Sequence, residues 1–444
     1  MGKFSNIKQV STLLMFQPPR GTRDFLPEEM IKRNWVIDKI RSIFEIYGFE
    51  PLGTPAFESW ELLKEKSGAD VINQIYYFKD KNERELGLRF EWTASLARVI
   101  ATHRELQMPF KRYAIGPVWR YENPSEKRFR EFWQADVDIV GVKDSIADAE
   151  VMAAAVDSLR SLGFKDFLIR LNDRRILEAF IEIVGIPKDQ SLDIIRIVDK
   201  LEKIGQEGVI KELRNYISNE KISIDLLNMI ATKGYPEKVL THITTYFEKN
   251  NNGLKGCDAL KSIVEYAKIF GFYEYIIVDL GLARGLDYYT GPVFEVTAKG
   301  YEDVGSIAGG GRYDEIINIF GGDSTPATGI SLGIERIIPL LELKGSFEEL
   351  ELGTKVLVTA VSGKVKKEAI QIAQYLRSEG ITTLMDLLGR NLRKQMEYSA
   401  KKNIKKVVIV GEKELAEKSV TVRDMKTGEQ KIIKIVELVV FLQA

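Results

Sequence analysis

Apolar residues recur at helical spacing between positions 27 and 48. Val36, Ile40 and Phe44 fall on one side of such a helix, with charged residues between them. A proline and two acidic residues stand at the start, where a helix tolerates proline and favours negative charge. The pattern therefore predicts an amphipathic helix that ends at Gly48.

The next part of the chain is rich in short runs of β-branched and aromatic residues. IYYFKD (75–80) and LGLRFEW (86–92) predict strands, and SLARVIATHREL (95–106) predicts a helix. Two longer strands are predicted at 111–122 and 130–141. The charged, proline-containing loop between these two strands predicts an antiparallel hairpin.

From residue 173 to 255 the pattern becomes helical again. Apolar pairs such as Ile176-Leu177 and Ile194-Ile195 form repeated stripes, and strand signals are few. The run Asn250-Asn251-Asn252-Gly253 predicts a loop that closes the stretch. We interpret 173–255 as a helical insertion inside a larger domain rich in β-structure.

Strand patterns return after this stretch. YEYIIVDL (273–280) and PVFEVTA (292–298) predict strands, and the glycines of IAGGGRYD (307–314) predict a turn. A further helix is predicted to begin near Gly333.

The last hundred residues alternate between strand and helix patterns. Strands are predicted at 355–361, 381–386 and 405–411, and helices near 364–379 and 391–402. Such alternation is typical of a small α/β domain with a largely parallel sheet. The acidic run that ends at Gly353 marks the linker before it.

These patterns together predict an α+β domain on an antiparallel sheet and a smaller C-terminal domain. The first would be built from residues 1–172 and 256–345, with the helical insertion at 173–255 between them. The α/β domain would occupy residues 352–444.

Composition narrows the possible functions. The 444 residues include 64 basic and 64 acidic side chains, so the formal net charge is zero. A dedicated nucleic-acid-binding module would be more basic, although a neutral protein can carry local basic patches. No apolar run approaches the roughly 18 residues of a membrane helix, and the N-terminal apolar patch is too short for a signal peptide. We therefore expect a cytoplasmic protein without membrane association.

Cysteine and histidine are rare. Cys257 is the only cysteine, which excludes a disulfide within the chain and zinc sites built from cysteine. His103 and His242, the only histidines, do not stand at metal-ligand spacing. We expect surface or structural roles for both, and no metal ion held by protein side chains.

The hairpin at 119–141 carries the first candidate chemistry. Its charged residues are Arg120, Glu122, Lys127, Arg128 and Arg130, and its interleaved aromatics are Phe129, Phe132 and Trp133. Guanidinium groups bind polyphosphates in a bidentate manner, and an aromatic ring beside them can stack on a base. From these residues alone, a charged and exposed hairpin with ordinary cross-strand pairs is the favoured interpretation.

Three further clusters are weak when each is taken alone. One places charged and phenolic side chains together between glycines: Arg284, Asp287, Tyr288 and Tyr289. Another has three consecutive glycines at 309–311, which would let the backbone approach a ligand closely. The third places Arg336 just inside a helix after small residues.

The order of these segments carries a family resemblance. PVWRYENPSEKRFREFWQADVDIVG (117–141) resembles motif 2 of the class II aminoacyl-tRNA synthetases, GFEPLGTPAFE (48–58) resembles motif 1, and ATGISLGIERI (327–337) resembles motif 3. LARGLDYYTGPVFEV (282–296) and IAGGGRYD are similar to two peptides specific to histidyl-tRNA synthetases. The resemblance covers nearly the whole chain in the expected order.

The resemblance implies an activity and its partners. Family members activate L-histidine with ATP to histidyl-adenylate and pyrophosphate, and then transfer histidine to the 3′ end of tRNA-His. ATP would be a substrate bound with Mg²⁺ on its phosphates. Family members also pair as homodimers through motif 1, and their antiparallel sheet binds ATP in a bent form.

The resemblance also assigns roles to residues. The ATP-binding residues would be Arg120, Glu122, Arg128, Phe132 and Arg336. The histidine-binding residues would be Glu91, Thr93, Gln134, Asp138, Arg284, Tyr288 and Tyr289. Arg120 and Arg284 would be catalytic, because preorganised cations stabilise the negative charge that develops on the phosphoryl oxygens in the transition state.

Phe90, Trp92 and Trp133 depart from the commoner family patterns and leave the pocket geometry open. The C-terminal domain resembles the anticodon-binding domain shared by the histidyl, prolyl, threonyl and glycyl enzymes. Its predicted tRNA-facing residues are Arg390, Arg393, Lys394 and Gln395. A solvated basic helix face is the alternative interpretation of these four.

Three other functions remain as alternatives. A synthetase-like regulatory subunit of histidine biosynthesis would resemble the catalytic part and lack the anticodon-binding domain. A pure RNA-binding module would not need Arg120, Arg284 and Arg336 in order. A prolyl enzyme would lack both histidine-specific peptides.

Overall fold

The computed structural model describes most of the chain. The described residues are 16–65, 69–125, 128–283, 288–348 and 355–443. They form two compact units, one built mainly from residues before Phe347 and the other mainly from residues after it.

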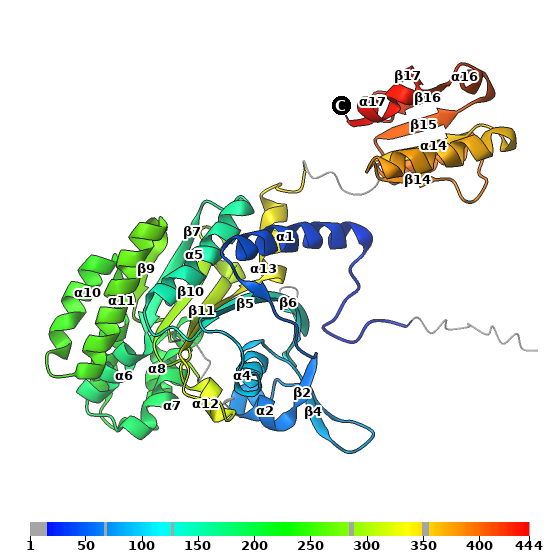
Figure 1. The fold of residues 1–444 in the computed structure, drawn as a ribbon. Coiled ribbons are helices and arrows are strands. Elements are labelled where there is room, and N and C mark those ends of the chain that lie inside the picture. Colours follow the sequence, from blue (N-terminus) through cyan, green and yellow to red (C-terminus); the bar gives the residue numbers. More distant parts are fainter. Residues whose placement is uncertain (1–15, 66–68, 126–127, 284–287, 349–354, 444) are drawn as a thin grey trace, which may run out of the picture. The chain divides into compact units, whose positions relative to one another are not determined.

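Among the described residues, nine strands form the main sheet of the first unit (Figure 1). Their order is β1 (Glu50–Pro51), β5 (Phe110–Trp119), β6 (Glu131–Val140), β12 (Ala327–Gly333), β11 (Ser306–Arg312), β10 (Pro292–Ala298), β7 (Phe167–Asp173), β9 (Ile276–Asp279) and β8 (Lys233–Gly234). The strands from β5 to β7 all pair antiparallel, while β1 pairs parallel with β5 and β9 pairs parallel with β7. The predicted α+β class on an antiparallel sheet is confirmed, with parallel pairs toward its edges.

The predicted hairpin is the β5–β6 pair. Its ladder sets Arg112 opposite Asp138 and Gly116 opposite Gln134. Since successive side chains of a strand point to opposite faces, Gln134, Asp136 and Asp138 share one face of β6. The register of one hairpin therefore presents three polar groups in a row.

The prediction of a turn at IAGGGRYD is wrong. This segment is strand β11, which lies between β10 and β12 in the middle of the sheet. Glycine is needed there because neighbours occupy the space of a side chain. A Cβ at Gly310 would clash with the Gly329 carbonyl oxygen, and one at Gly311 would lie 2.7 Å from the Tyr289 ring.

Helices cover one face of the sheet. α5 (Ile146–Ser161) and α13 (Ile334–Leu343) pack against β6, β11 and β12, and α1 (Pro27–Ile46) lies beside them (Figure 1). The buried side of α5 is rich in alanine, which lets the helix lie close to the strands. The helix predicted from residue 27 is confirmed, and Gly48 follows it with a φ of 74°.

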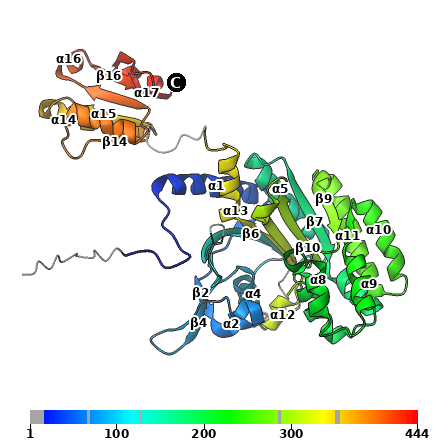
Figure 2. The ribbon, with the colours of Figure 1, turned by 180° about the vertical axis from the view of Figure 1, so that it is seen from behind.

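The segment predicted as a helical insertion is helical and lies beside β7 and β9 (Figure 2). Its helices are α6 (Arg174–Ile183), α7 (Ser191–Val198), α8 (Leu201–Leu213), α9 (Glu220–Ile230), α10 (Pro236–Thr244) and α11 (Asn251–Phe270). The predicted closing loop at 250–253 is wrong, because the Asn250 side chain accepts a hydrogen bond from Gly253 N at 2.9 Å and caps α11. Helical structure therefore continues past residue 255.

Smaller elements complete this unit. β2 (Phe57–Ser59), β4 (Glu85–Leu88) and β3 (Tyr77–Lys79) form a three-stranded sheet. α4 (Thr93–Thr102) follows it, and the short α12 (Ile316–Ile319) packs against α4. Over the described ranges, no helix has the length and apolar character required to cross a membrane.

The second unit is an α/β domain. Its described strands run in the order β14 (Thr383–Met385), β13 (Val356–Ala360), β15 (Lys406–Val410), β16 (Ser419–Asp424) and β17 (Gln430–Lys434), with helices α14 (Lys366–Ser378) and α15 (Leu392–Lys401). The five predicted elements are confirmed. The sheet is mixed rather than largely parallel, because β16 and β17 add antiparallel pairs.

Candidate active site

Two adjoining cavities lie on the sheet formed by β6, β11 and β12. The outer cavity has a volume of about 230 Å³ and the inner cavity one of about 60 Å³. Four residues line both: Arg120, Gln134, Gly309 and Ser331. Because the cavities share these walls, a ligand in one would lie next to a ligand in the other.

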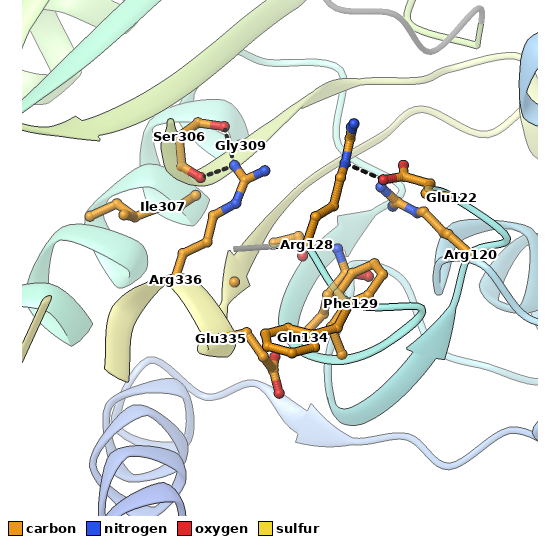
Figure 3. Close-up of a pocket in the computed structure, with 14 residues that line it drawn as sticks. Arg120, Glu122, Arg128, Phe129, Gln134, Ser306, Ile307, Gly309, Glu335 and Arg336 are labelled. Atoms are coloured by element: carbon orange, nitrogen blue, oxygen red, sulfur yellow. Dashed lines mark hydrogen bonds and ion pairs between the residues drawn. The ribbon is translucent and has the colours of Figure 1, made fainter. Parts of the chain in front are cut away.

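The outer cavity is rich in arginine (Figure 3). Arg120, Arg128 and Arg336 line it together with Phe129 and Phe132. These guanidinium groups come from the end of β5, the hairpin loop and the first turn of α13, so three separate segments converge. Such a cluster is suited to a polyanion.

Each arginine is held by its surroundings. Arg120 Nε donates to the Phe90 carbonyl oxygen at 3.1 Å, and its guanidinium lies 5.1 Å from the Phe132 ring centroid. Arg336 Nη1 donates to the Ser306 carbonyl oxygen at 2.5 Å. Arg128 forms an ion pair with Glu122. Burial lowers the pKa of Arg120, against the charges of Glu122 and Glu91. Burial also lowers the pKa of Arg336, and the charges of Arg128 and Arg120 add to this.

The inner cavity combines carboxylates with phenols. Its other polar side chains are Glu91, Thr93, Asp136, Asp138, Tyr288, Tyr289 and Tyr313. Glu91 lies two residues before α4, and its carboxylate oxygens accept from Thr93 N at 2.5 Å and Ala94 N at 2.8 Å in the first turn. Thr93 Oγ1 lies 3.5 Å from the Tyr288 hydroxyl oxygen. Burial raises the pKa of Glu91, while these hydrogen bonds oppose the rise.

Asp138 lies in a buried charge network. Its Oδ2 is 2.6 Å from Arg112 Nη2, and its Oδ1 accepts from the Tyr313 hydroxyl. Burial raises the pKa of Asp138, and the Arg112 charge opposes this. A Cβ at Gly329 would clash with Asp138 Oδ1, so the glycine leaves room for the carboxylate.

The predicted residues therefore gather at one place, apart from two sets. Arg284 and Asp287 lie outside the described residues, as does Lys127. The tRNA-facing residues lie in the second unit. The other residues assigned to ATP or histidine line one or both cavities, whereas Arg130 and Trp133 of the hairpin line neither.

Three residues of the inner cavity or its support were not predicted: Arg112, Asp136 and Tyr313. A signal for each exists in the sequence. Arg112 lies opposite Asp138 once the hairpin register is known, Asp136 shares a strand face with Gln134, and Tyr313 stands in IAGGGRYD.

The unusual aromatic residues have structural roles. Phe90 packs with Leu63 and Ile75, and its carbonyl oxygen holds Arg120. The Trp92 ring lies 3.8 Å from the Arg89 guanidinium, outside both cavities. These positions support the walls without entering the pocket.

Trp133 points away from the cavities. Its backbone N–H donates to Glu335 Oε2 at 2.6 Å, and its ring lies 5.4 Å from the Arg33 guanidinium. Gln134 and Phe132, its neighbours on β6, take the cavity face instead. Trp133 therefore does not reshape the pocket.

The second unit presents part of the predicted tRNA-facing set. Arg393 and Lys394 are exposed on α15, while Arg390 bonds Asp386 Oδ1 at 2.5 Å and lies 4.1 Å from the Tyr398 ring. Gln395 differs from the expectation, because it is buried.

Gln395 supports the loop that precedes α15. Its Nε2 donates to the Arg390 carbonyl oxygen at 2.5 Å, and its Oε1 accepts from the Thr359 hydroxyl. A buried side-chain amide whose N–H and oxygen both form hydrogen bonds within the protein has a structural role. We therefore do not include Gln395 among residues that contact RNA.

The two histidines lie at the surface, as expected. His103 Nδ1 lies 3.1 Å from Glu105 Oε1, and His242 is exposed on α10. Neither lines the two cavities.

Comparisons with known proteins agree with this arrangement. A family model described as histidyl-tRNA synthetase matches residues 21–337, and one described as anticodon binding domain matches residues 355–444. A histidine–tRNA ligase of Pyrococcus furiosus is 42% identical over 97% of this chain and 99% of its own length. One of Thermococcus kodakarensis is 41% identical over 94% of this chain and 95% of its own length.

A solved structure has the same fold over its whole length. The histidyl-tRNA synthetase of a Nostoc species superposes with a TM-score of 0.84 at 31% identity, covering 97% of this chain and 99% of that one. With matched family models, near full-length relatives and convergent cavities, the chain belongs to the histidyl-tRNA synthetase family.

Proposed function

We propose that the two cavities form the adenylation site of this histidine–tRNA ligase, with ATP in the outer cavity and L-histidine in the inner one. The observation that carries the assignment is their shared wall. Arg120 and Gln134 line both cavities. The histidine carboxylate would meet the α-phosphate at this junction, which holds the reacting groups together.

The outer cavity would bind ATP through charge and stacking. Arg120 would contact the α-phosphate, while Arg128 and Arg336 would lie near the γ-phosphate. Phe132 would stack on adenine, and Glu122 would help to hold the base. The guanidinium groups are positioned before the reaction, so charge that develops on departing pyrophosphate is stabilised without rearrangement.

The inner cavity would bind histidine. Glu91, Thr93 and Gln134 would hold the α-amino group, Asp138 and Tyr289 would bond the ring nitrogens, and Tyr288 would complete the wall. The family resemblance also assigns Arg284 to the carboxylate and α-phosphate. A site whose polar groups pair with the imidazole penalises amino acids that leave those groups unpaired.

Magnesium would enter with the ATP phosphates. Glu335, which lines the outer cavity, is engaged by Arg33 and by Trp133 N–H. Glu122 also lines it and is paired with Arg128, so the phosphate oxygens would be the main ligands of the ion. The ion would neutralise charge on the phosphates, while the arginines orient them.

The second unit would bind the anticodon of tRNA-His. Arg393 and Lys394 offer exposed cations for phosphates, and Arg390 borders the loop before α15. We also propose that the protein acts in the cytoplasm as a homodimer that pairs through motif 1, as other family members do.

The test is ATP–pyrophosphate exchange with each amino acid in turn. We expect exchange with L-histidine alone, since this establishes adenylation and its specificity together. Absence of exchange from folded protein that still binds histidine would instead favour a regulatory subunit. Exchange with a different amino acid would place histidine outside the inner cavity.

A further inference from the structure

Asp136 is a buried carboxylate with no assigned role. It lies on β6 between Gln134 and Asp138 and is 7% exposed. Its Oδ1 has no hydrogen-bond partner among the described residues. Burying an ionisable group without full pairing is costly, so a ligand that supplies the missing partner would bind with added affinity.

The other carboxylates of the inner cavity are already engaged. Asp138 has Arg112 on one oxygen and the Tyr313 hydroxyl on the other. Both oxygens of Glu91 accept backbone N–H groups at the start of α4. Asp136 is thus the described carboxylate in this cavity that retains an unpartnered oxygen.

The position of Asp136 indicates which part of the substrate it meets. The residues shared by both cavities mark where the histidine carboxylate must lie. Asp136 lines the inner cavity but not the outer one, and it stands beside Asp138 on the same strand face. The imidazole ring is the part of histidine directed away from the phosphates, and its N–H is a hydrogen-bond donor.

We propose that Asp136 is a specificity-determining residue of the histidine pocket, whose carboxylate accepts a hydrogen bond from an imidazole N–H of the substrate. This inference rests on the proposed function, because it requires histidine in the inner cavity. This contact replaces the one that the family resemblance assigns to Asp138, which is held by Arg112 and Tyr313 and acts as the neighbouring fixed charge. Two carboxylates of strand β6, those of Asp136 and Asp138, therefore lie at the end of the pocket that binds the ring.

The surroundings of Asp136 suit such an acceptor. Burial raises its pKa to about 7. The Arg112 charge on β5 and the nearby Ser331 hydroxyl on β12 lower this pKa, while the charges of Asp138 on β6 and of Glu91 before α4 raise it. A donor from the substrate favours the ionised form. The carboxylate is therefore poised to respond to an N–H group near neutral pH.

The test compares two ligands with three proteins. L-Histidine has a ring N–H, while 3-(4-thiazolyl)alanine keeps a ring nitrogen and has no N–H. Equilibrium dissociation constants are measured for wild type, Asp136→Asn and Asp136→Ala. We expect Asp136→Ala to weaken histidine binding by about tenfold or more and thiazolylalanine binding by less than threefold. Asp136→Asn, which keeps a neutral acceptor, should fall between wild type and Asp136→Ala for histidine.

Controls separate this contact from other causes. Asp225→Asn, on the exposed face of α9, should leave both dissociation constants unchanged. Equal losses for the two ligands would overturn the proposal, because they would indicate an α-amino contact or a deformed pocket. Unchanged histidine affinity in Asp136→Ala would also overturn it.

The wild-type exchange reaction with histidine is measured first. If it is absent, the proposed function fails before any variant is considered. If it is present and the Asp136 variants bind histidine like wild type, only the role of Asp136 fails.

Discussion

The outer and inner cavities differ in how their charges are partnered. The outer cavity has three arginines. Two of them donate hydrogen bonds to backbone carbonyl oxygens, one of these also lies near an aromatic ring, and the third pairs with a carboxylate. The inner cavity has carboxylates fixed by Arg112, Tyr313 and the start of α4. The outer cavity therefore suits a negatively charged ligand, which would pair with the arginines. The inner cavity holds its polar groups in fixed positions, which suits one particular side chain.

This difference separates the expected effects of substitutions. In the outer cavity a change should act mainly on catalysis or ATP binding, with little loss of stability. In the inner cavity the same groups support the fold and bind the substrate, so both should change together.

The largest expected effect is on the rate of adenylation. Arg120→Ala removes the cation at the junction of the two cavities, where charge develops on the α-phosphate. We expect kcat for ATP–pyrophosphate exchange to fall by about 10³-fold, with the free energy of unfolding nearly unchanged. A fall in KM for histidine of similar size to the fall in kcat would contradict a role in the transition state.

Asp138→Ala should cost stability and affinity together. Its removal leaves Arg112 buried without its carboxylate, which costs about 3–5 kcal/mol. Chemical denaturation measures this loss, and calorimetry measures histidine binding. If histidine affinity falls in a protein of wild-type stability, the buried network does not support the fold as described.

Arg336→Ala should change ATP binding alone. Its guanidinium lines the outer cavity only, so KM for ATP should rise about 10–100-fold, equivalent to roughly 1.4–2.8 kcal/mol of lost binding. The dissociation constant for histidine, measured without ATP, should stay within a factor of two. Arg336→Lys, which keeps the charge and loses the fork, should recover part of the effect.

The last effect depends on pH and concerns stability rather than catalysis. Because the pKa of Asp136 is about 7 in the folded protein and about 3.8 unfolded, the folded state binds more protons between these values. Wild-type stability should therefore fall, relative to Asp136→Asn, as pH rises from about 4 to 7. The variant should be more stable by up to about 4 kcal/mol above pH 7 and equal to wild type below pH 4. Thermal or urea unfolding across this range measures the difference, and a constant difference would exclude titration of Asp136 as its cause.

Sequence patterns predicted most of the elements, because periodicity is a local property. The helix α1, the β5–β6 hairpin and the alternating elements of the second unit follow from spacing alone. The arginines of the outer cavity were also predictable as residue types that suit phosphates.

What failed depended on distant neighbours. Three consecutive glycines are typical of a turn, and distant neighbours such as the Gly329 carbonyl and the Tyr289 ring explain their place in a central strand. Likewise, the pairing of Arg112 with Asp138 follows from strand register, which the sequence does not state. Asn250 resembled a loop residue because capping and loop residues are the same types.

Glu335 links helix α1 and strand β6 to the segment that carries Arg336. Its neighbour Arg336 faces the outer cavity, while its own carboxylate holds Arg33 of α1 at 2.5 Å and the N–H of Trp133 at 2.6 Å. Arg33 is 2% exposed. With ATP in the outer cavity as proposed, a mutational scan scored only by ATP concentration dependence would flag Arg33 as a nucleotide contact, although Arg33 does not line this cavity and acts through the carboxylate beside Arg336.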